Sequence, residues 1–301
     1  VHYKETFAPV AKGASFRLAL ALALKNNMKV RHIDVETAFP YAPLKEEVYM
    51  EPPPGVHLPR GYCLKLQKSL YGLKQSPRNW NDHIKSTITS LGYTQCVLDN
   101  CIYYRRDNGV LHMLLIYVDD IIVLSEDNDH IRHVVSEFEK EYAMQDLGDL
   151  QHYLGIVVDR DGDIFKIHQK VYAEKIVSRF KHLLPKTHSP TLTPMPSTIK
   201  LTRESRVTET RKQREYAHHF PYQSVVGALM YLAVNTRLDL CYTVNSLSRF
   251  NKEPTYQACR AAVHALQYVA STTDYGLVLR AQSDSHGDDL EGYSDSDWAV
   301  D

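Results

Sequence analysis

The sequence predicts an α+β fold in which antiparallel hairpins are combined with amphipathic helices. Strand-like runs at 101–105 and 110–118 are joined by Asp107-Asn108-Gly109, a strong hairpin turn signal. A second apolar run, IIVLS, follows at 121–125, so that Asp119 and Asp120 interrupt two strand-like segments. Residues 127–142 carry apolar side chains at helical spacing. Tight hairpins together with separate helices are typical of the α+β class.

The remaining elements are expected in chain order from hydrophobic spacing and from turn residues. Expected helices are 14–27, 76–91, a basic amphipathic helix at 170–182, and a largely helical stretch from 221 onward. Expected strands are 29–35, 47–50, 62–71, a hairpin within 153–167, and 290–295. The segment 185–200 is rich in Pro, Thr and Ser, which predicts a linker or an extended arm.

Composition excludes several classes of protein. Of 301 residues, 44% are hydrophobic and 24% are charged, which is typical of a globular protein and not of a disordered chain. No apolar run approaches the roughly 20 residues of a membrane helix. The five cysteines form no C-x-x-C pair, which argues against a disulfide framework or a zinc site. Because the chain begins at Val1 without an initiator Met or an apolar leader, we expect a piece of a longer translation product.

The small net charge of −1 hides a separation of charge along the chain. Residues 166–214 hold twelve Lys or Arg and three Glu, a net charge of +9. A basic block beside acidic segments suggests a polyanionic partner held near a carboxylate-rich centre. The alternative is a solvated basic face that binds nothing.

Three segments carry residues suited to chemistry. Asp119 and Asp120 stand at the tip of an apolar hairpin, where Mg²⁺ bound through carboxylates and substrate phosphates would compensate their charge. Asp34 ends another strand, and a two-metal phosphoryl-transfer site needs carboxylates from separate strands. In the segment 69–80, Gly72 would let the backbone approach a ligand closely. The alternative for Asp119 and Asp120 is an acidic turn in water, and the alternative for Asp34 is a helix cap. The alternative for the segment 69–80 is a simple loop-to-helix turn.

Eight segments fall in a fixed order along nearly the whole chain. They are ETFAPV at 5–10, IDVETAF at 33–39, EEVYMEPPPG at 46–55, LYGLKQSPRNW at 70–80, YVDD at 117–120, DLGDLQHYLGI at 146–156, YQSVVGALMYLAVNTRLDL at 222–240 and GYSDSDWAVD at 292–301. Together they resemble the reverse transcriptases of Ty/copia-type (Pseudoviridae) retrotransposons, which are parts of a Pol polyprotein.

The resemblance implies a right-hand polymerase with fingers, thumb and an antiparallel palm sheet. It implies RNA-directed DNA synthesis from dNTPs on an RNA template and a DNA primer, with two Mg²⁺ ions that Mn²⁺ could replace. By this resemblance the metal ligands are Asp34, Asp119 and Asp120, the gate under the sugar is Phe39, and the nucleotide loop contains Tyr71, Gly72 and Lys74. The primer grip would consist of Leu154, Gly155 and Ile156, and the thumb that tracks the duplex would use Lys170, Lys175, Arg179 and Lys181. The first acid of a truncated ribonuclease H site would be Asp295.

The resemblance also divides the chain and implies its partners. We expect partial fingers and palm at 1–165, a basic thumb and linker at 166–220, a helical connection at 221–289 and the start of a ribonuclease H-like domain at 290–301. Integrase would precede this piece and ribonuclease H would follow it, in an intracellular, cytoplasmic virus-like particle with no membrane partner. The alternative is a catalytically decayed, nucleic-acid-binding relic, which is favoured by Gln145 at a position where the family often has Lys.

Overall fold

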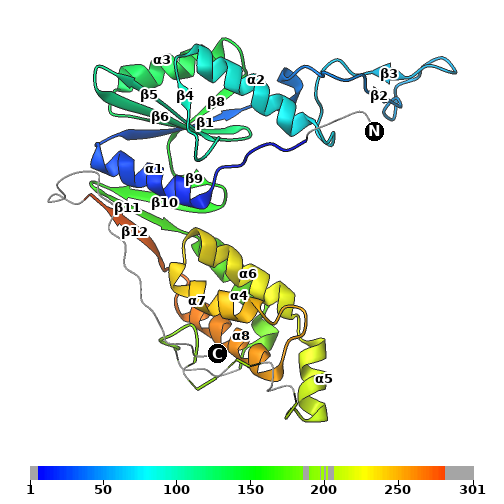
Figure 1. The fold of residues 1–301 in the computed structure, drawn as a ribbon, viewed down its shortest axis with the longest axis vertical. Helices are drawn as coiled ribbons and strands as arrows, with labels where there is room; N and C mark the ends of the chain where they lie inside the picture. Colours follow the sequence, from blue (N-terminus) through cyan, green and yellow to red (C-terminus); the bar gives the residue numbers. More distant parts are fainter. Residues whose placement is uncertain (1–5, 186–189, 197, 200, 203–206, 282–301) are drawn as a thin grey trace. The chain divides into compact units, whose positions relative to one another are not determined.

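The computed structural model describes residues 6–185, 190–196, 198–199, 201–202 and 207–281. They form two compact units, divided between Leu150 and Gln151, whose elements are labelled in Figure 1. Both units combine helices with antiparallel sheets, which confirms the α+β class. Among the described residues, no helix has the length and apolarity that a membrane span requires.

The first unit is built on a six-stranded sheet in the order β4-β5-β6-β7-β1-β8, with every neighbouring pair antiparallel. Asn108 and Gly109 both have positive φ and join β5 to β6, as the turn signal predicts. The edge strand β8 was not predicted, because its residues do not alternate. The strands are β1 (Lys29–Val35), β4 (Thr94–Gln95), β5 (Ile102–Asp107), β6 (Val110–Tyr117), β7 (Asp120–Ser125) and β8 (Met144–Asp149).

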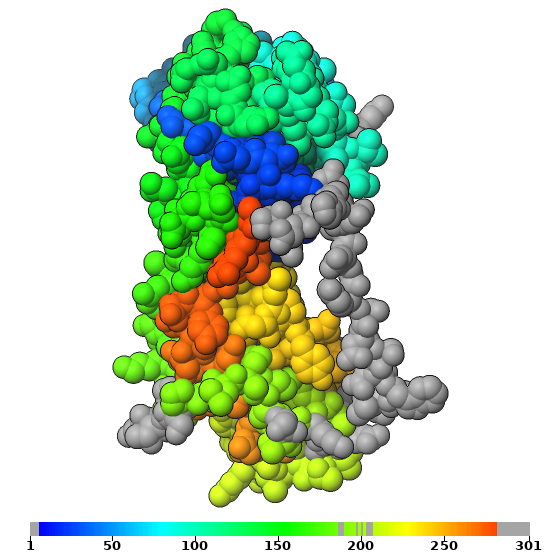
Figure 2. All heavy atoms as spheres, turned by 90° about the vertical axis from the view of Figure 1, so that its left-hand side faces the viewer, coloured from blue at the N-terminus to red at the C-terminus, as the bar shows by residue number. Residues whose placement is uncertain are grey.

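Two helices cover one face of this sheet and a third lies on the other face (Figure 1). α2 (Ser76–Ser90) and α3 (Asn128–Glu139) bury Trp80, Ile84 and Phe138 against Ile33 and Leu114 of the sheet. α1 (Gly13–Lys25), dark blue in Figure 2, buries Phe16 and Leu20 and leaves Leu18 52% exposed. The apolar spacing of the segments now seen as α2 and α3 therefore predicted which face of each is buried.

The segment between β1 and α2 has less regular structure than the sequence predicts. It holds the short helix η1 (Phe39–Tyr41) and the two-residue strands β2 (Tyr49–Met50) and β3 (Leu64–Lys65). The strand expected at 62–71 is therefore wrong in length. Beyond Leu66, pairing is reduced to one isolated bridge between Lys68 and Pro43, and Pro43 has no N–H with which to continue a ladder.

In its described residues, the second unit packs five α-helices beside a four-stranded antiparallel sheet in the order β12-β11-β10-β9. Its core joins apolar side chains of α4, α6, α7 and α8, among them Ile176, Leu229 and Leu266. The strands are β9 (His152–Tyr153), β10 (Ile156–Asp161), β11 (Ile164–His168) and β12 (Gly276–Arg280). The helices are α4 (Lys170–Arg179), α5 (Arg211–His219), α6 (Tyr222–Asn235), α7 (Cys241–Ser248) and α8 (Tyr256–Ser271).

Two differences from the predicted elements stand out in this unit. The basic helix ends at Arg179 and is followed by a short 3-10 turn, η2 (Lys181–Leu183), so it is shorter than expected. Strand β12 lies within the stretch expected to be helical, because its pairing with β11 comes from a distant part of the chain. The strand expected at 290–295 lies outside the described residues, and the domain boundaries at 165, 220 and 289 remain predictions.

Candidate active site

Strand pairing in the first unit brings three carboxylates together. In the antiparallel register of β1 and β7, Asp34 stands directly opposite Asp120, and directly opposed residues of such a pair place their side chains on the same face of the sheet. Asp119 lies in the turn between β6 and β7, and its carbonyl oxygen accepts a hydrogen bond from the Val35 amide at 3.0 Å. The site therefore lies at one end of the adjacent strands β6, β7 and β1.

The electrostatics of this cluster favour a cation. Partial burial raises the pKa of Asp34 above its ordinary value, and the negative charges of Asp119 and Asp120 raise it further. His32 opposes this effect, and its Nε2 lies 2.8 Å from Oδ1 of Asp120. A raised pKa means that the ionised form of Asp34 is disfavoured, so the cluster carries negative charge that its surroundings do not fully compensate. Carboxylate oxygens in such a cluster suit Mg²⁺ or Mn²⁺.

Tyr71 lies near the carboxylates, and Phe39 packs against Tyr71. Phe39 begins η1 and is 9% exposed, and its ring centroid lies 4.4 Å from that of Tyr71. Tyr71 is 56% exposed as a whole, yet partial burial raises its pKa, and the charge of Asp119 raises it further. The two observations agree if the hydroxyl end faces the acids while the rest of the ring meets solvent. Tyr71, paired with Phe39, thus flanks the carboxylate cluster.

Gly72 and Lys74 line a different feature, a cavity of about 490 Å³ that they share with Glu46, Glu47 and Tyr49. Gly72 has a φ of +96°, and beyond its two chain neighbours no described residue has an atom within 4 Å of the place where a Cβ would stand. A backbone that needs glycine beside open space leaves room for a close approach by a ligand. Lys74 is exposed on this surface.

The other predicted site residues lie in the second unit. Leu154 and Gly155 both have positive φ and form the two-residue turn between β9 and β10, and Ile156 is buried. Tyr231 donates a hydrogen bond to the Leu154 carbonyl at 3.0 Å. Lys170, Lys175, Arg179 and Lys181 are exposed on α4 and η2, while Ile176 and Phe180 are buried, as the amphipathic spacing predicts. Asp295 lies outside the described residues.

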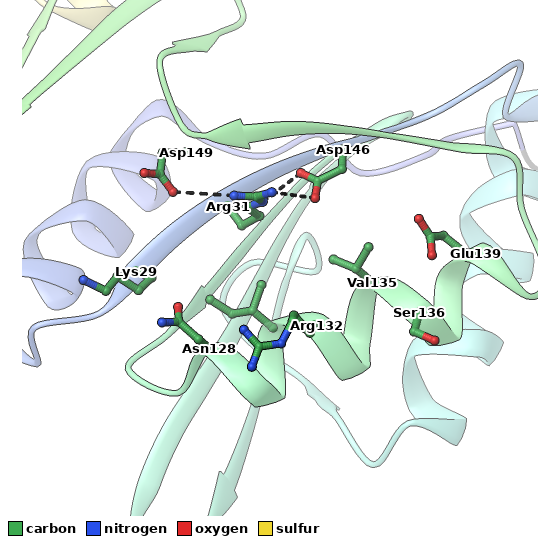
Figure 3. A pocket seen from close by; sticks show the side chains of 10 residues that line it. Lys29, Arg31, Asn128, Arg132, Val135, Ser136, Glu139, Asp146 and Asp149 are labelled. Atoms are coloured by element: carbon green, nitrogen blue, oxygen red, sulfur yellow. Dashed lines mark hydrogen bonds and ion pairs between the residues drawn. The ribbon is translucent and has the colours of Figure 1, made fainter.

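A pocket of about 610 Å³ lies between β1, β8 and α3 in the first unit. Figure 3 shows Arg31 at its wall, where the guanidinium forms two hydrogen bonds of 2.7 Å to Asp146, while Asp149 lies 3.9 Å away. The bond to Asp146 raises the pKa of Arg31 and lowers that of Asp146. The three acidic residues of the candidate site do not line this pocket. The Arg31–Asp146 ion pair therefore links the side chains of the edge strand β8 and of β1.

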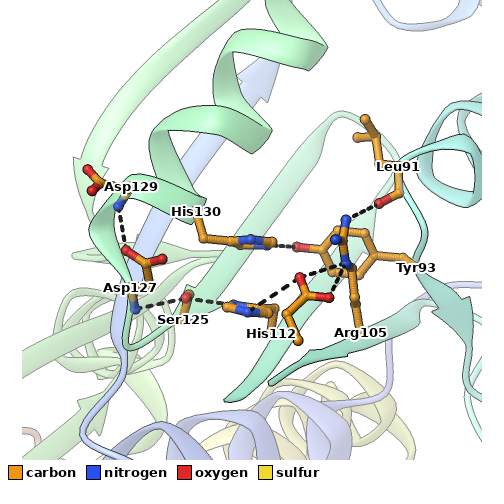
Figure 4. A network of polar contacts seen from close by, with 9 residues as sticks. Leu91, Tyr93, Arg105, His112, Ser125, Asp127, Asp129 and His130 are labelled. Atoms are coloured by element: carbon orange, nitrogen blue, oxygen red, sulfur yellow. Dashed lines mark hydrogen bonds and ion pairs between the residues drawn. The ribbon is translucent and has the colours of Figure 1, made fainter. Parts of the chain in front are cut away.

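A polar network that the sequence did not predict lies at the opposite end of the sheet (Figure 4). The rings of His112 and His130 stack with centroids 3.6 Å apart and an interplanar angle of 17°. Nδ1 of His112 lies 2.8 Å from the Ser125 hydroxyl, and Nε2 of His130 lies 2.8 Å from the Tyr93 hydroxyl. The signal that could have revealed it is His112 itself, a lone basic residue in a buried apolar strand.

With Asp107, the two histidines form a group of side chains that could in principle hold a metal ion. Two features oppose this. Arg105 already pairs with Asp107 through contacts of 2.9 and 2.7 Å, and nearly parallel stacked rings do not direct their in-plane nitrogen lone pairs toward a common point, as a tetrahedral ion requires. We therefore interpret this network as structural.

Comparison with known proteins agrees with the resemblance seen in the motifs. Residues 1–195 match the family described as reverse transcriptase (RNA-dependent DNA polymerase). The Retrovirus-related Pol polyprotein from transposon TNT 1-94 of Nicotiana tabacum is 34% identical over 100% of this chain and 22% of its own length. The Pol polyprotein from transposon RE2 of Arabidopsis thaliana is 34% identical over 99% of the chain and 20% of its length.

A shorter relative matches over most of both chains. The transposon Ty5-1 protein of Saccharomyces cerevisiae is 31% identical over 83% of this chain and 79% of its own length. The chain thus spans about a fifth of the length of the two plant polyproteins that it matches.

Proposed function

The chain belongs to the reverse transcriptase (RNA-dependent DNA polymerase) family, and from this premise we propose that it is the polymerase part of a copia-like retrotransposon Pol polyprotein. The reaction is template-directed addition of a deoxynucleotide to a primer. The primer 3′-oxygen attacks the α-phosphorus of the dNTP, the bond to the bridging oxygen breaks, and pyrophosphate leaves. RNA template and DNA primer are the proposed nucleic-acid substrates.

One observation carries this proposal: Asp34 and Asp120 face each other across β1 and β7, with Asp119 in the adjoining turn. In our proposal these residues hold two Mg²⁺ ions, with Asp119 as a direct ligand. The ions would activate the primer hydroxyl and stabilise the leaving oxygens. The raised pKa of Asp34 supports this assignment, because a bound cation would offset the charge that disfavours its ionised form.

Other residues take roles in positioning the substrates. We assign the six-stranded sheet to the palm, and Phe39 to the gate that lies under the sugar of the incoming nucleotide. Tyr71, Gly72 and Lys74 would contact the nucleotide and template, and the turn at 154–156 would grip the primer end. The exposed cations of α4 and η2 would form a thumb surface, since phosphate contacts position a duplex without reading its sequence. Positioning and charge supply most of the catalysis in this scheme.

The rest of the proposal concerns the longer protein. The length of the plant relatives suggests that further domains accompany this chain, and we propose integrase before it and ribonuclease H after it. Assembly in a cytoplasmic virus-like particle would bring these domains to the RNA template.

A second candidate function is a nucleic-acid-binding relic without turnover. The exposed cations of α4 favour nucleic-acid binding under both hypotheses. The relic is favoured by Gln145, the partner of Asp34 in the β1–β8 register, which stands where the family often has Lys. Primer extension separates the two. With Mg²⁺, a DNA primer and an RNA template, we expect the chain to extend the primer and Asp119→Asn to abolish extension without loss of fold. Binding without extension by the parent chain would favour the relic.

A further inference from the structure

The carbonyl oxygen of Val118, which precedes Asp119, accepts a hydrogen bond from a buried indole. Nε1 of Trp80 lies 2.7 Å from this oxygen, and Trp80 is 2% exposed. Trp80 belongs to α2, whereas Val118 begins the turn between β6 and β7. The bond therefore connects the helix that follows the proposed nucleotide loop to the turn that carries a catalytic acid. None of the roles proposed above includes Trp80.

The turn that receives this bond is conformationally strained. Val118 has a φ of 57°, a region that β-branched residues very rarely adopt. Asp119, the second residue of the turn, does not have a positive φ. A two-residue turn with positive φ at its first residue only is a type II′ turn, which favours glycine at the position that Val118 occupies. Such a conformation persists only where its surroundings hold it. Two hydrogen bonds do so here, from Trp80 to the Val118 carbonyl and from the Val35 amide to the Asp119 carbonyl.

Aromatic neighbours fix the direction of the indole N–H. The Trp80 ring meets Tyr142 edge to face at 5.4 Å, and the rings of His83 and Tyr41 lie at 6.0 and 6.4 Å. Tyr41 in turn accepts a hydrogen bond from the Ala143 amide. Because the ring is packed on several sides, its rotation would require the surrounding core to move. The donor is therefore preorganised toward the turn.

We propose that Trp80 is a positioning residue, whose N–H holds Val118 in the strained conformation that presents Asp119 beside Asp34. This inference rests on the proposed function, because the step that it serves is nucleotide addition. Trp80 touches no reacting atom. Its loss should therefore slow the chemical step while leaving the binding of nucleotide and primer–template unchanged.

The test compares Trp80→Phe, which keeps a large ring and removes the N–H, with Tyr222→Phe as a matched control. Tyr222 is a buried aromatic residue in the second unit, and its hydroxyl donates to the Leu247 carbonyl at 2.9 Å. We expect Trp80→Phe to lower kcat by about tenfold or more with an unchanged KM for dNTP. In metal-free protein, the Val35 amide should exchange its hydrogen faster, because its acceptor is the Asp119 carbonyl. Tyr222→Phe should lower the melting temperature without either effect.

A rescue experiment separates positioning from general packing. In a Val118→Gly background the positive φ carries no steric strain, so adding Trp80→Phe should cost much less in kcat than it does in the parent. An additive loss in that background, or unchanged Val35 exchange in Trp80→Phe, would overturn the proposal. If the parent chain extends no primer, the proposed function fails, while the exchange of the Val35 amide still decides whether Trp80 fixes the turn.

Discussion

The stacked imidazoles of His112 and His130 predict that the first unit loses stability in mild acid. Burial lowers the pKa of both side chains, and that of His130 falls from 6.5 to about 4, with the neighbouring His112 as a further cause. Between pH 6.5 and about 4 the unfolded chain therefore binds more protons at this position than the folded chain. Stability is fully present above pH 6.5 and is lost as the pH falls toward 4.

The size of the effect follows from the fall in the pKa of His130. A group fully shielded from solvent with this pKa would contribute at most about 3 kcal/mol. His130 is partly exposed, so screening by solvent reduces the expected loss to about 1–2 kcal/mol in the free energy of unfolding. Asp107 adds little in this window, because Arg105 lowers the pKa of that carboxyl and so moves its titration to lower pH.

The assay is urea unfolding at pH 7.5 and pH 5, followed by the fluorescence of Trp80 in a Trp298→Phe background so that the signal reports on the first unit. His130→Gln should flatten the pH dependence, because glutamine stays neutral and can still reach the Tyr93 hydroxyl. His133→Gln is the matched control on the same helix, where the side chain is 60% exposed. Equal acid destabilisation of the parent and His130→Gln would refute this reasoning.

Two further predictions test the proposed substrate contacts. Phe39→Val should raise ribonucleotide incorporation relative to dNTP incorporation by roughly tenfold or more, because the smaller side chain leaves room for a 2′-hydroxyl. Competition between dNTP and rNTP measures this ratio, and an unchanged ratio would count against Phe39 as the gate. The double change Lys175→Ala, Arg179→Ala should weaken binding to an RNA–DNA hybrid equally for unrelated sequences and reduce the log–log salt slope by about 0.9 for each phosphate that the variant no longer neutralises. The exposed Lys252→Ala serves as the control, and coincident slopes in parent and double variant would place the duplex elsewhere.

Local patterns were sufficient to predict elements with unambiguous spacing. The strand Lys29–Val35 and the Asn108-Gly109 hairpin were predicted because strand-forming residues and turn chemistry act over a few residues. Strands β8 and β12 were not predicted. The segment Met144–Asp149 shows no alternation, and Gly276–Arg280 is a strand through pairing with the distant β11.

The candidate site was also predicted only in part from local sequence patterns. Motifs identified Asp34, Asp119 and Asp120 one segment at a time, but only the strand register shows that Asp34 faces Asp120. The hydrogen bond of Trp80 to Val118 joins a helix to a turn, and positive φ at a valine contradicts local preference, so no short pattern could predict it. Sites of this kind depend on tertiary interactions that hold a locally unfavourable conformation.

If Asp34, Asp119 and Asp120 form a metal site, Mg²⁺ must stabilise the first unit, and thermal unfolding with and without Mg²⁺ measures this stabilisation. Asp34→Asn removes one of three mutually repelling acids, so the metal-free variant should melt about 2–4 °C above the parent for each kcal/mol of repulsion relieved. Mg²⁺ should then raise the melting temperature of the parent but not that of Asp34→Asn. Glu126→Gln, at an exposed acid beyond the other end of β7, should respond to Mg²⁺ as the parent does. Equal Mg²⁺ responses in parent and Asp34→Asn, or none in the parent, would show that these three acids do not form the metal site.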